Sequence, residues 1–94
     1  MPTTRASVST EHASRYLQQL SKHWSHKFPV SFDATQARIE LTDQRVLLMT
    51  ADADRLDVTA TAPDEASLAR FQIVIEEHIR RFAFKETLEF VWKA

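Results

Sequence analysis

The spacing of apolar residues changes along the chain, and this change constrains the fold more than any other feature. In two segments apolar residues recur every three to four positions, as on one face of an α-helix, and between them short runs alternate as strands do. The two helical stripes are Ala13, Tyr16, Leu17, Leu20 and Trp24, and Leu68, Phe71, Ile75, Ile79 and Phe82. The sequence therefore predicts two amphipathic helices separated by consecutive strands.

Residues at the ends of the two stripes predict where the helices begin and end. Ser9 or Thr10 offers a hydroxyl that would cap the first helix, and Pro29 ends it because its ring cannot continue an α-helix. Pro63 and Asp64 open the second helix, with Asp64 as the cap. We therefore expect both helices to begin with a side-chain cap.

The other segments have the period of two that strands require. Four runs lie between the helices, at 28–32, 37–41, 45–50 and 56–60, and two more lie outside them, at 5–8 and 88–93. The links between the four inner runs are short and polar, which favours hairpins and antiparallel pairing. The predicted order is β-α-β-β-β-β-α-β. Because both helix stripes need an apolar sheet face, the predicted fold is an α+β two-layer sandwich with both helices on one face.

Length and composition indicate an ordinary globular protein. The 94 residues are 44% hydrophobic and 27% charged, which fits one hydrophobic core, so we expect residues 1–94 to form a single α+β domain. The chain has no cysteine, which excludes disulfides, thiolate metal sites and cysteine nucleophiles. It also has no glycine, which excludes the glycine-rich loops that cradle phosphates.

The charge and the N-terminal residues bear on partners and location. A net charge of −1 is unlike the coherent basic surface of a nucleic-acid-binding protein, so no nucleic-acid partner is expected. The first ten residues lack the apolar run of a signal peptide, and no run reaches the ~20 apolar residues of a membrane span. We therefore expect a cytoplasmic protein without a membrane partner.

One edge of the first helix is polar and partly basic. At about 100° per residue, His23, Gln19, His12, Arg15 and His26 follow one another beside the buried stripe. Side chains of this kind bind anions and donate hydrogen bonds. This edge is therefore the candidate site of the chain.

The histidines of that edge allow two interpretations. His23 and His26 stand three residues apart and can share one metal ion, with a third ligand from His78 or Glu86, because a metal site needs at least three protein ligands. In the other interpretation His23 caps the edge of the core and His26 is solvated near the helix end. His78 would then be a boundary histidine with its hydrogen bonds satisfied.

Two apolar features have no place in the predicted core. Ile73 points away from the second helical stripe, and one side of the 47–49 run would face the uncovered side of the sheet. Single exposed apolar residues are common, but together these leave room for a homodimer through a patch on sheet or helix.

Several segments resemble a known family of small bacterial proteins. The run at 13–30, the pairs Phe32-Asp33 and Arg38-Ile39, and the segments 51–54 and 78–86 with Trp92 are similar to the family catalogued as domain of unknown function 2218. Some proteins of this kind are joined to siderophore-interacting flavin reductases or lie near iron-uptake genes, so the resemblance implies an accessory part in iron handling. The polar positions that match are Arg15, His23, His26, Lys27, Arg81 and Glu86.

The chain departs from that family in two turns. Members usually carry glycine in the turn before the strand that holds Arg38 and in the next turn, where this chain has Gln36-Ala37 and residues 42–44. The departure bears on the geometry of those turns rather than on the fold.

Together these observations favour a non-catalytic binding or accessory module without a cofactor. Its site would be the basic flank, which we define as Arg15, Gln19, His23, His26, Lys27 and Arg81. The flank would meet a small anionic ligand or a siderophore-related reductase. Two alternatives stay open: a metal-assisted enzyme that uses His23 and His26, and a self-associating structural protein.

Overall fold

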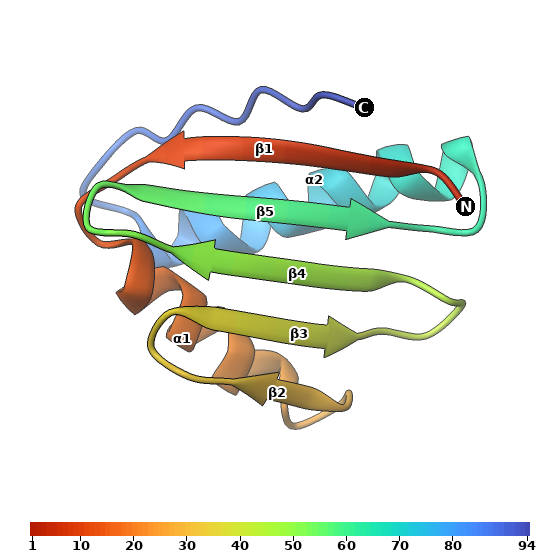
Figure 1. The fold of residues 1–94 in the computed structure, drawn as a ribbon, viewed down its shortest axis with the longest axis horizontal. Helices are drawn as coiled ribbons and strands as arrows, with labels where there is room; N and C mark the ends of the chain where they lie inside the picture. Colours follow the sequence, from red (N-terminus) through yellow and green to blue (C-terminus); the bar gives the residue numbers. More distant parts are fainter.

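The computed structural model describes all 94 residues, which form five strands and two helices (Figure 1). In chain order these are β1 (Thr3–Ser9), α1 (Ala13–Trp24), β2 (Val30–Phe32), β3 (Gln36–Glu40), β4 (Val46–Ala51), β5 (Arg55–Thr61) and α2 (Glu65–Phe82). The strands form one sheet in the order β1-β5-β4-β3-β2, and every neighbouring pair is antiparallel. The predicted α+β class with an antiparallel sheet is confirmed.

Both helices cover the same face of the sheet. In Figure 1 they lie behind the strands, and the face toward the viewer is uncovered. Helix α1 contacts β2 to β5, whereas α2 contacts β5 and α1. The two-layer arrangement with one open face is therefore as predicted. No helix combines the length and apolarity that crossing a bilayer requires.

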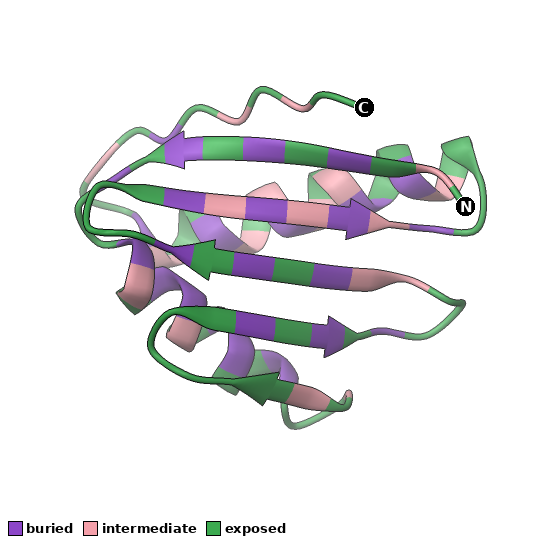
Figure 2. Ribbon diagram, viewed as in Figure 1, coloured by how far each residue is buried: buried purple, intermediate pink, exposed green.

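The core lies between the helices and the sheet. Buried and exposed residues alternate along the strands (Figure 2), because successive side chains of a strand point to opposite faces. Twenty-three buried apolar residues form one cluster, in which Leu17, Ile39, Leu47, Phe71 and Ile75 are fully enclosed. Burying an aliphatic or phenylalanine side chain contributes about 1.5–3 kcal/mol, so this cluster holds the two layers together.

The helices start differently from one another. Asp64 caps α2 as predicted, because its carboxylate accepts a hydrogen bond from the Ser67 backbone N–H at 2.7 Å. The predicted hydroxyl cap of α1 is wrong: the N-cap residue is His12, which makes no side-chain cap. Instead the Thr10 hydroxyl accepts the His12 backbone N–H at 3.1 Å and stabilises the turn that leads into the helix.

The two turns that lack glycine are built in different ways. Between β2 and β3 the Asp33 carboxylate accepts hydrogen bonds from the backbone N–H groups of Thr35 and Gln36, at 2.8 and 2.9 Å. A side chain thus makes the hydrogen bonds that stabilise this turn. Between β3 and β4, Asp43 and Gln44 both have φ of 61°. That is the left-handed region that glycine occupies most readily. This turn therefore adopts a conformation that favours glycine, although its two residues both carry side chains.

The predicted last strand at 88–93 is reduced to one backbone pair. Only Lys93 joins the sheet, through two hydrogen bonds with Arg5 of 2.7 and 2.8 Å. The residues before it are held on α2 by their side chains, since Trp92 Nε1 donates to Glu76 at 2.7 Å and the Arg80 guanidinium lies 5.1 Å from the centre of the Phe90 ring. These contacts hold the segment against the helix, which explains why its alternating pattern does not become a paired strand.

Candidate functional site

The structure places part of the basic flank in a hollow beside α1. Arg15 and Gln19 are exposed on this helix and line a cavity of about 270 Å³, which we call the flank hollow. Its complete lining is His12, Arg15, Tyr16, Gln19, Phe82, Phe84, Lys85 and Glu86. The hollow therefore lies between one face of α1 and the chain that follows α2.

Local structure explains why these residues meet. His12, Arg15, Tyr16 and Gln19 are spaced three and four apart, so they share one side of α1. After α2 the chain turns at the buried Ala83, whose N–H bonds to Ile79 and whose carbonyl accepts the Glu86 N–H at 3.1 Å. This turn brings residues 84–86 alongside α1.

A polar cluster anchors that turn, and we call it the Glu86 clamp. Glu86 Oε2 accepts the Thr10 hydroxyl at 2.9 Å and the Tyr16 hydroxyl, so one carboxylate joins the start of α1, the helix itself and the segment after α2. Burial of the ring and then the neighbouring carboxylate raise the pKa of Tyr16 to about 12. The hydrogen bond from Tyr16 lowers the pKa of Glu86. Glu86 is therefore ionised at neutral pH and Tyr16 keeps its proton.

The basic residues of the hollow have no ionic partner in the chain. All salt bridges lie elsewhere: Arg38–Glu40, Arg55–Asp52, Arg55–Asp57 and Arg80–Glu76. Arg15 and Lys85 are both exposed and neither side chain donates a hydrogen bond to another group of the protein. The Lys85 ammonium lies 5.7 Å from the centre of the neighbouring Phe84 ring. Both cations are thus free to meet an anion from solution.

In the other half of the basic flank, His23 lies beside aromatic rings. The His23 ring lies 5.4 Å from the ring of His78 and 6.3 Å from that of Phe82, measured between ring centres. Partial removal from water lowers the pKa of His23, and positive charge on His78, Lys27, His26 and Arg81 lowers it further. These four neighbours are all basic side chains, so basic groups gather at this end of the flank.

The structure contains no ready metal site. No three or more histidine, aspartate or glutamate side chains lie close enough together to hold one ion. Of the two candidate third ligands, His78 Nδ1 donates to the Val74 carbonyl at 2.7 Å, and Glu86 is held in its clamp. His23 and His26 thus remain a pair at best, and the metal hypothesis stays a prediction.

Comparison with known proteins places the chain in a family. A family model described as an uncharacterised protein conserved in bacteria, DUF2218, matches residues 5–93. The chain belongs to this family. It is also similar to a solved NMR structure, PA4090 from Pseudomonas aeruginosa, with 36% sequence identity and a TM-score of 0.82, over 99% of this chain and 96% of that one. No curated protein gives a match.

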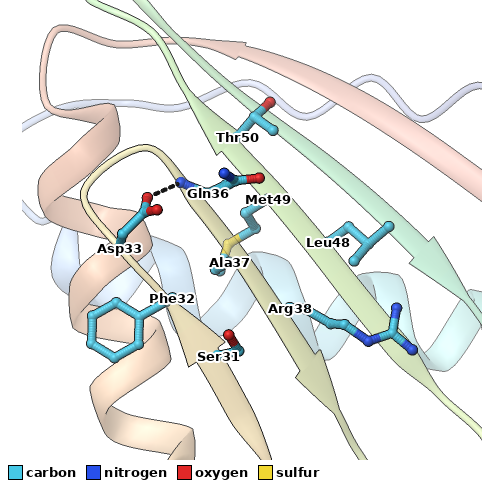
Figure 3. Close-up of a pocket in the computed structure, with 9 residues that line it drawn as sticks. All are labelled: Ser31, Phe32, Asp33, Gln36, Ala37, Arg38, Leu48, Met49 and Thr50. Atoms are coloured by element: carbon cyan, nitrogen blue, oxygen red, sulfur yellow. Dashed lines mark hydrogen bonds between the residues drawn. The ribbon is translucent and has the colours of Figure 1, made fainter.

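This DUF2218 member also has two shallow hollows on the uncovered sheet face, which the sequence did not single out. Figure 3 shows one of about 430 Å³, lined by β2, β3, β4 and the turn in which Asp33 accepts the Gln36 N–H. The second, of about 810 Å³, lies over β1 and β5 beside Val91 and Lys93. Leu48 belongs to both and is 40% exposed. The polar alternation of these strands is what any solvated sheet face shows, so it carried no signal of a hollow.

The two apolar features behind the predicted homodimer do not form one patch. Ile73 is 56% exposed on the helix layer, whereas Leu48 lies on the uncovered face of the sheet. Self-association of this DUF2218 member therefore stays a prediction.

Sequence reasoning found Arg15 and Gln19 but missed the residues that face them. Phe84 and Lys85 follow the end of α2, in a segment whose position relative to α1 depends on the turn at Ala83. The sequence suggests Glu86 as a third metal ligand and as a position that matches the family, whereas its partners in the structure are hydroxyl groups. The available signal was the short polar run at 85–87 soon after an amphipathic helix, which by itself is typical of a loop.

Proposed function

We propose that this chain is a non-catalytic binding module that holds a small anionic ligand in the flank hollow. One observation carries the proposal: Arg15 and Lys85 line the same hollow, and neither has an ionic partner. Charge-assisted hydrogen bonds to a carboxylate or phosphate are the strongest that such side chains make. Because the net charge of the chain is −1, the protein as a whole does not attract anions, so this arrangement supports anion binding at the hollow itself.

The pKa shifts of Glu86 and Tyr16 argue against a role for this pair in acid–base catalysis. A general acid or base works best with a pKa near the operating pH. Here the pKa of Glu86 is lowered from its ordinary value and that of Tyr16 is raised to about 12, so both move away from neutrality. The ionised Glu86 favours the protonated phenol of Tyr16, and the Tyr16 hydroxyl favours the ionised carboxylate of Glu86. Such mutual stabilisation suits a structural role.

The family resemblance supports an accessory role in iron or siderophore metabolism. Siderophores and ferric chelates present carboxylate or phenolate oxygens, which are the groups that Arg15 and Lys85 would bind. Lys27 and Arg81 extend the positive surface toward the end of the flank, where an acidic edge of a reductase partner would meet it. The ligand in the hollow is the part of this proposal that can be tested first.

The experiment is an NMR titration of the ¹⁵N-labelled protein with citrate and, in parallel, with gallium citrate as a diamagnetic substitute for the ferric complex. We expect chemical-shift changes at Arg15, Gln19 and Lys85, and an affinity that falls as salt is added. The double variant Arg15→Gln with Lys85→Gln should weaken binding by at least tenfold, because it removes two charge-assisted contacts.

A matched control removes the same charge elsewhere. Lys22 and Arg70 are exposed, lie on α1 and α2, and do not line the hollow. The double variant Lys22→Gln with Arg70→Gln should leave the affinity unchanged. Equal losses in both double variants would show that only net charge matters, and would contradict the proposal. Tighter binding of the metal complex than of citrate would support the iron link, and equal binding would remove it.

A further inference from the structure

The flank hollow combines aromatic rings with its two cations. Phe82 and Phe84 both belong to its lining, together with the buried Tyr16. Phe84 is 78% exposed, the highest exposure of any large apolar residue in the chain. Single exposed apolar residues are common, but this one lies at a hollow that also contains Arg15 and Lys85. A ligand that covered the Phe84 ring would bury apolar surface that the protein leaves open.

The size of the hollow restricts what can occupy it. Its volume of about 270 Å³ lies just below the ~300 Å³ at which pockets for drug-sized ligands begin. One ring with one acidic group fits within such a space, whereas most drug-sized ligands need a larger one. The hollow is therefore suited to a small ligand with a single ring.

The charges of the lining specify the acidic group. The guanidinium of Arg15 is a planar fork that matches the two oxygens of a carboxylate, and the ammonium of Lys85 adds a second positive charge. The one acidic residue of the lining, Glu86, already accepts hydrogen bonds from two hydroxyl groups on Oε2, so its negative charge is partly offset within the clamp. The Glu86 clamp also holds the segment that carries Phe84 and Lys85 against α1.

We infer that the flank hollow binds a small aryl carboxylate, with the ring against Phe84 and Phe82 and the carboxylate on Arg15 and Lys85. The inference rests on the proposed function and narrows its ligand to one chemical class. An aliphatic acid would meet the cations but gain little from the rings. A neutral aromatic compound would meet the rings and leave the cations without an anion.

The test compares three probes of similar size by NMR titration: benzoate, cyclohexanecarboxylate and benzyl alcohol. Pairing of aromatic rings increases affinity by a factor of about 2 to 10 beyond area burial, so benzoate should bind tighter than cyclohexanecarboxylate by that factor. Benzyl alcohol should bind at least tenfold more weakly than benzoate, because it lacks the charge. Shifts at Phe84, Lys85 and Arg15 should accompany binding of the acids.

Two variants separate the ring from the charge. Phe84→Leu keeps apolar bulk but leaves only the Phe82 ring, so it should bring benzoate affinity closer to that of cyclohexanecarboxylate and leave the latter unchanged. Arg15→Gln should weaken both acids by about tenfold or more. The matched control is Phe32→Leu, because Phe32 is also exposed but lines a hollow on the opposite face of the sheet. This control should not change the affinity of any probe.

The outcomes distinguish this inference from the proposed function. Equal affinity for the two acids, both dependent on Arg15, would overturn the aryl preference and leave anion binding intact. Binding of citrate without binding of benzoate would do the same. If no anion, citrate included, changed the chemical shifts of the residues that line the hollow, both the aryl-carboxylate inference and the proposed function would be overturned. Equal binding of benzyl alcohol and benzoate would show an apolar hollow and contradict the role of the cations.

Discussion

Replacing Glu86 with glutamine tests the clamp that shapes the flank hollow, and the chain provides its own reporter. Tyr16 is the only tyrosine in the sequence, so the ultraviolet absorbance of tyrosinate reports on this one side chain. It is 4% exposed, and its hydroxyl donates to Glu86. Its titration therefore measures directly whether the carboxylate is where the structure places it.

The magnitude follows from the pKa of Tyr16, which rises from 10.0 to about 12 in the folded protein. Two pKa units correspond to about 3 kcal/mol that favours the protonated phenol in the folded state. Because the folded pKa is the higher one, this contribution is complete below pH 10 and is lost as the pH rises toward 12. In Glu86→Gln the midpoint should fall between these two values, since burial, the largest cause of the shift, remains.

The same variant should also unfold more easily at neutral pH. A hydrogen bond to a charged group contributes roughly 1 kcal/mol more than a neutral one, and Glu86 accepts two such bonds, so we expect a loss of about 1–2 kcal/mol in urea unfolding. Glu89→Gln is the control, because Glu89 is exposed in the same segment and does not contact Tyr16.

Circular dichroism at each pH must show that the protein is still folded during the tyrosine titration. A wild-type midpoint near 10.0 in folded protein would refute the reasoning. So would identical midpoints for wild type and Glu86→Gln, since the carboxylate would then have no influence on the phenol.

Three further predictions concern pH, a turn and the core. The lowered pKa of His23 means that the unfolded chain binds a proton more readily, so the urea midpoint should decrease as the pH is lowered from about 7.5 to about 5. His23→Gln should flatten this dependence strongly, whereas His26→Gln, which removes only one of the smaller influences on that pKa, should flatten it much less. Gln44→Gly should raise the free energy of unfolding by up to ~1 kcal/mol, because φ of 61° strains a residue with a Cβ; a loss of stability would contradict the turn geometry. Phe71→Ala should cost about 3–5 kcal/mol in the same assay, whereas Ile73→Ala, at an exposed site, should change stability by less than ~0.5 kcal/mol.

The fold was predictable from the sequence because its information is local and repeated. The stripe through Leu68, Phe71 and Ile75 has a period that only a helix satisfies, and the alternation around Ile39 and Val58 suits only strands. The links between the inner strands are short and polar, and short links favour antiparallel hairpins. The alternation at 88–93 gave a wrong prediction because the position of this segment depends on a distant element. Its side chains pack on α2, and an alternation of apolar and polar residues is the same whether a segment packs on a helix or pairs in a sheet.

The candidate site was predictable only in part. The sequence by itself determined the two helices, the inner strands and a polar edge on α1, because each depends on residues a few positions apart. It also determined that Arg15 and Gln19 lie on that edge. Only the tertiary structure decided what faces them, since Thr10 and Glu86 are separated by 76 positions and meet through the packing of both helices on one sheet. The hollow forms where surfaces from distant parts of the chain come together, and the spacing of residues along the sequence does not predict which of these surfaces will meet.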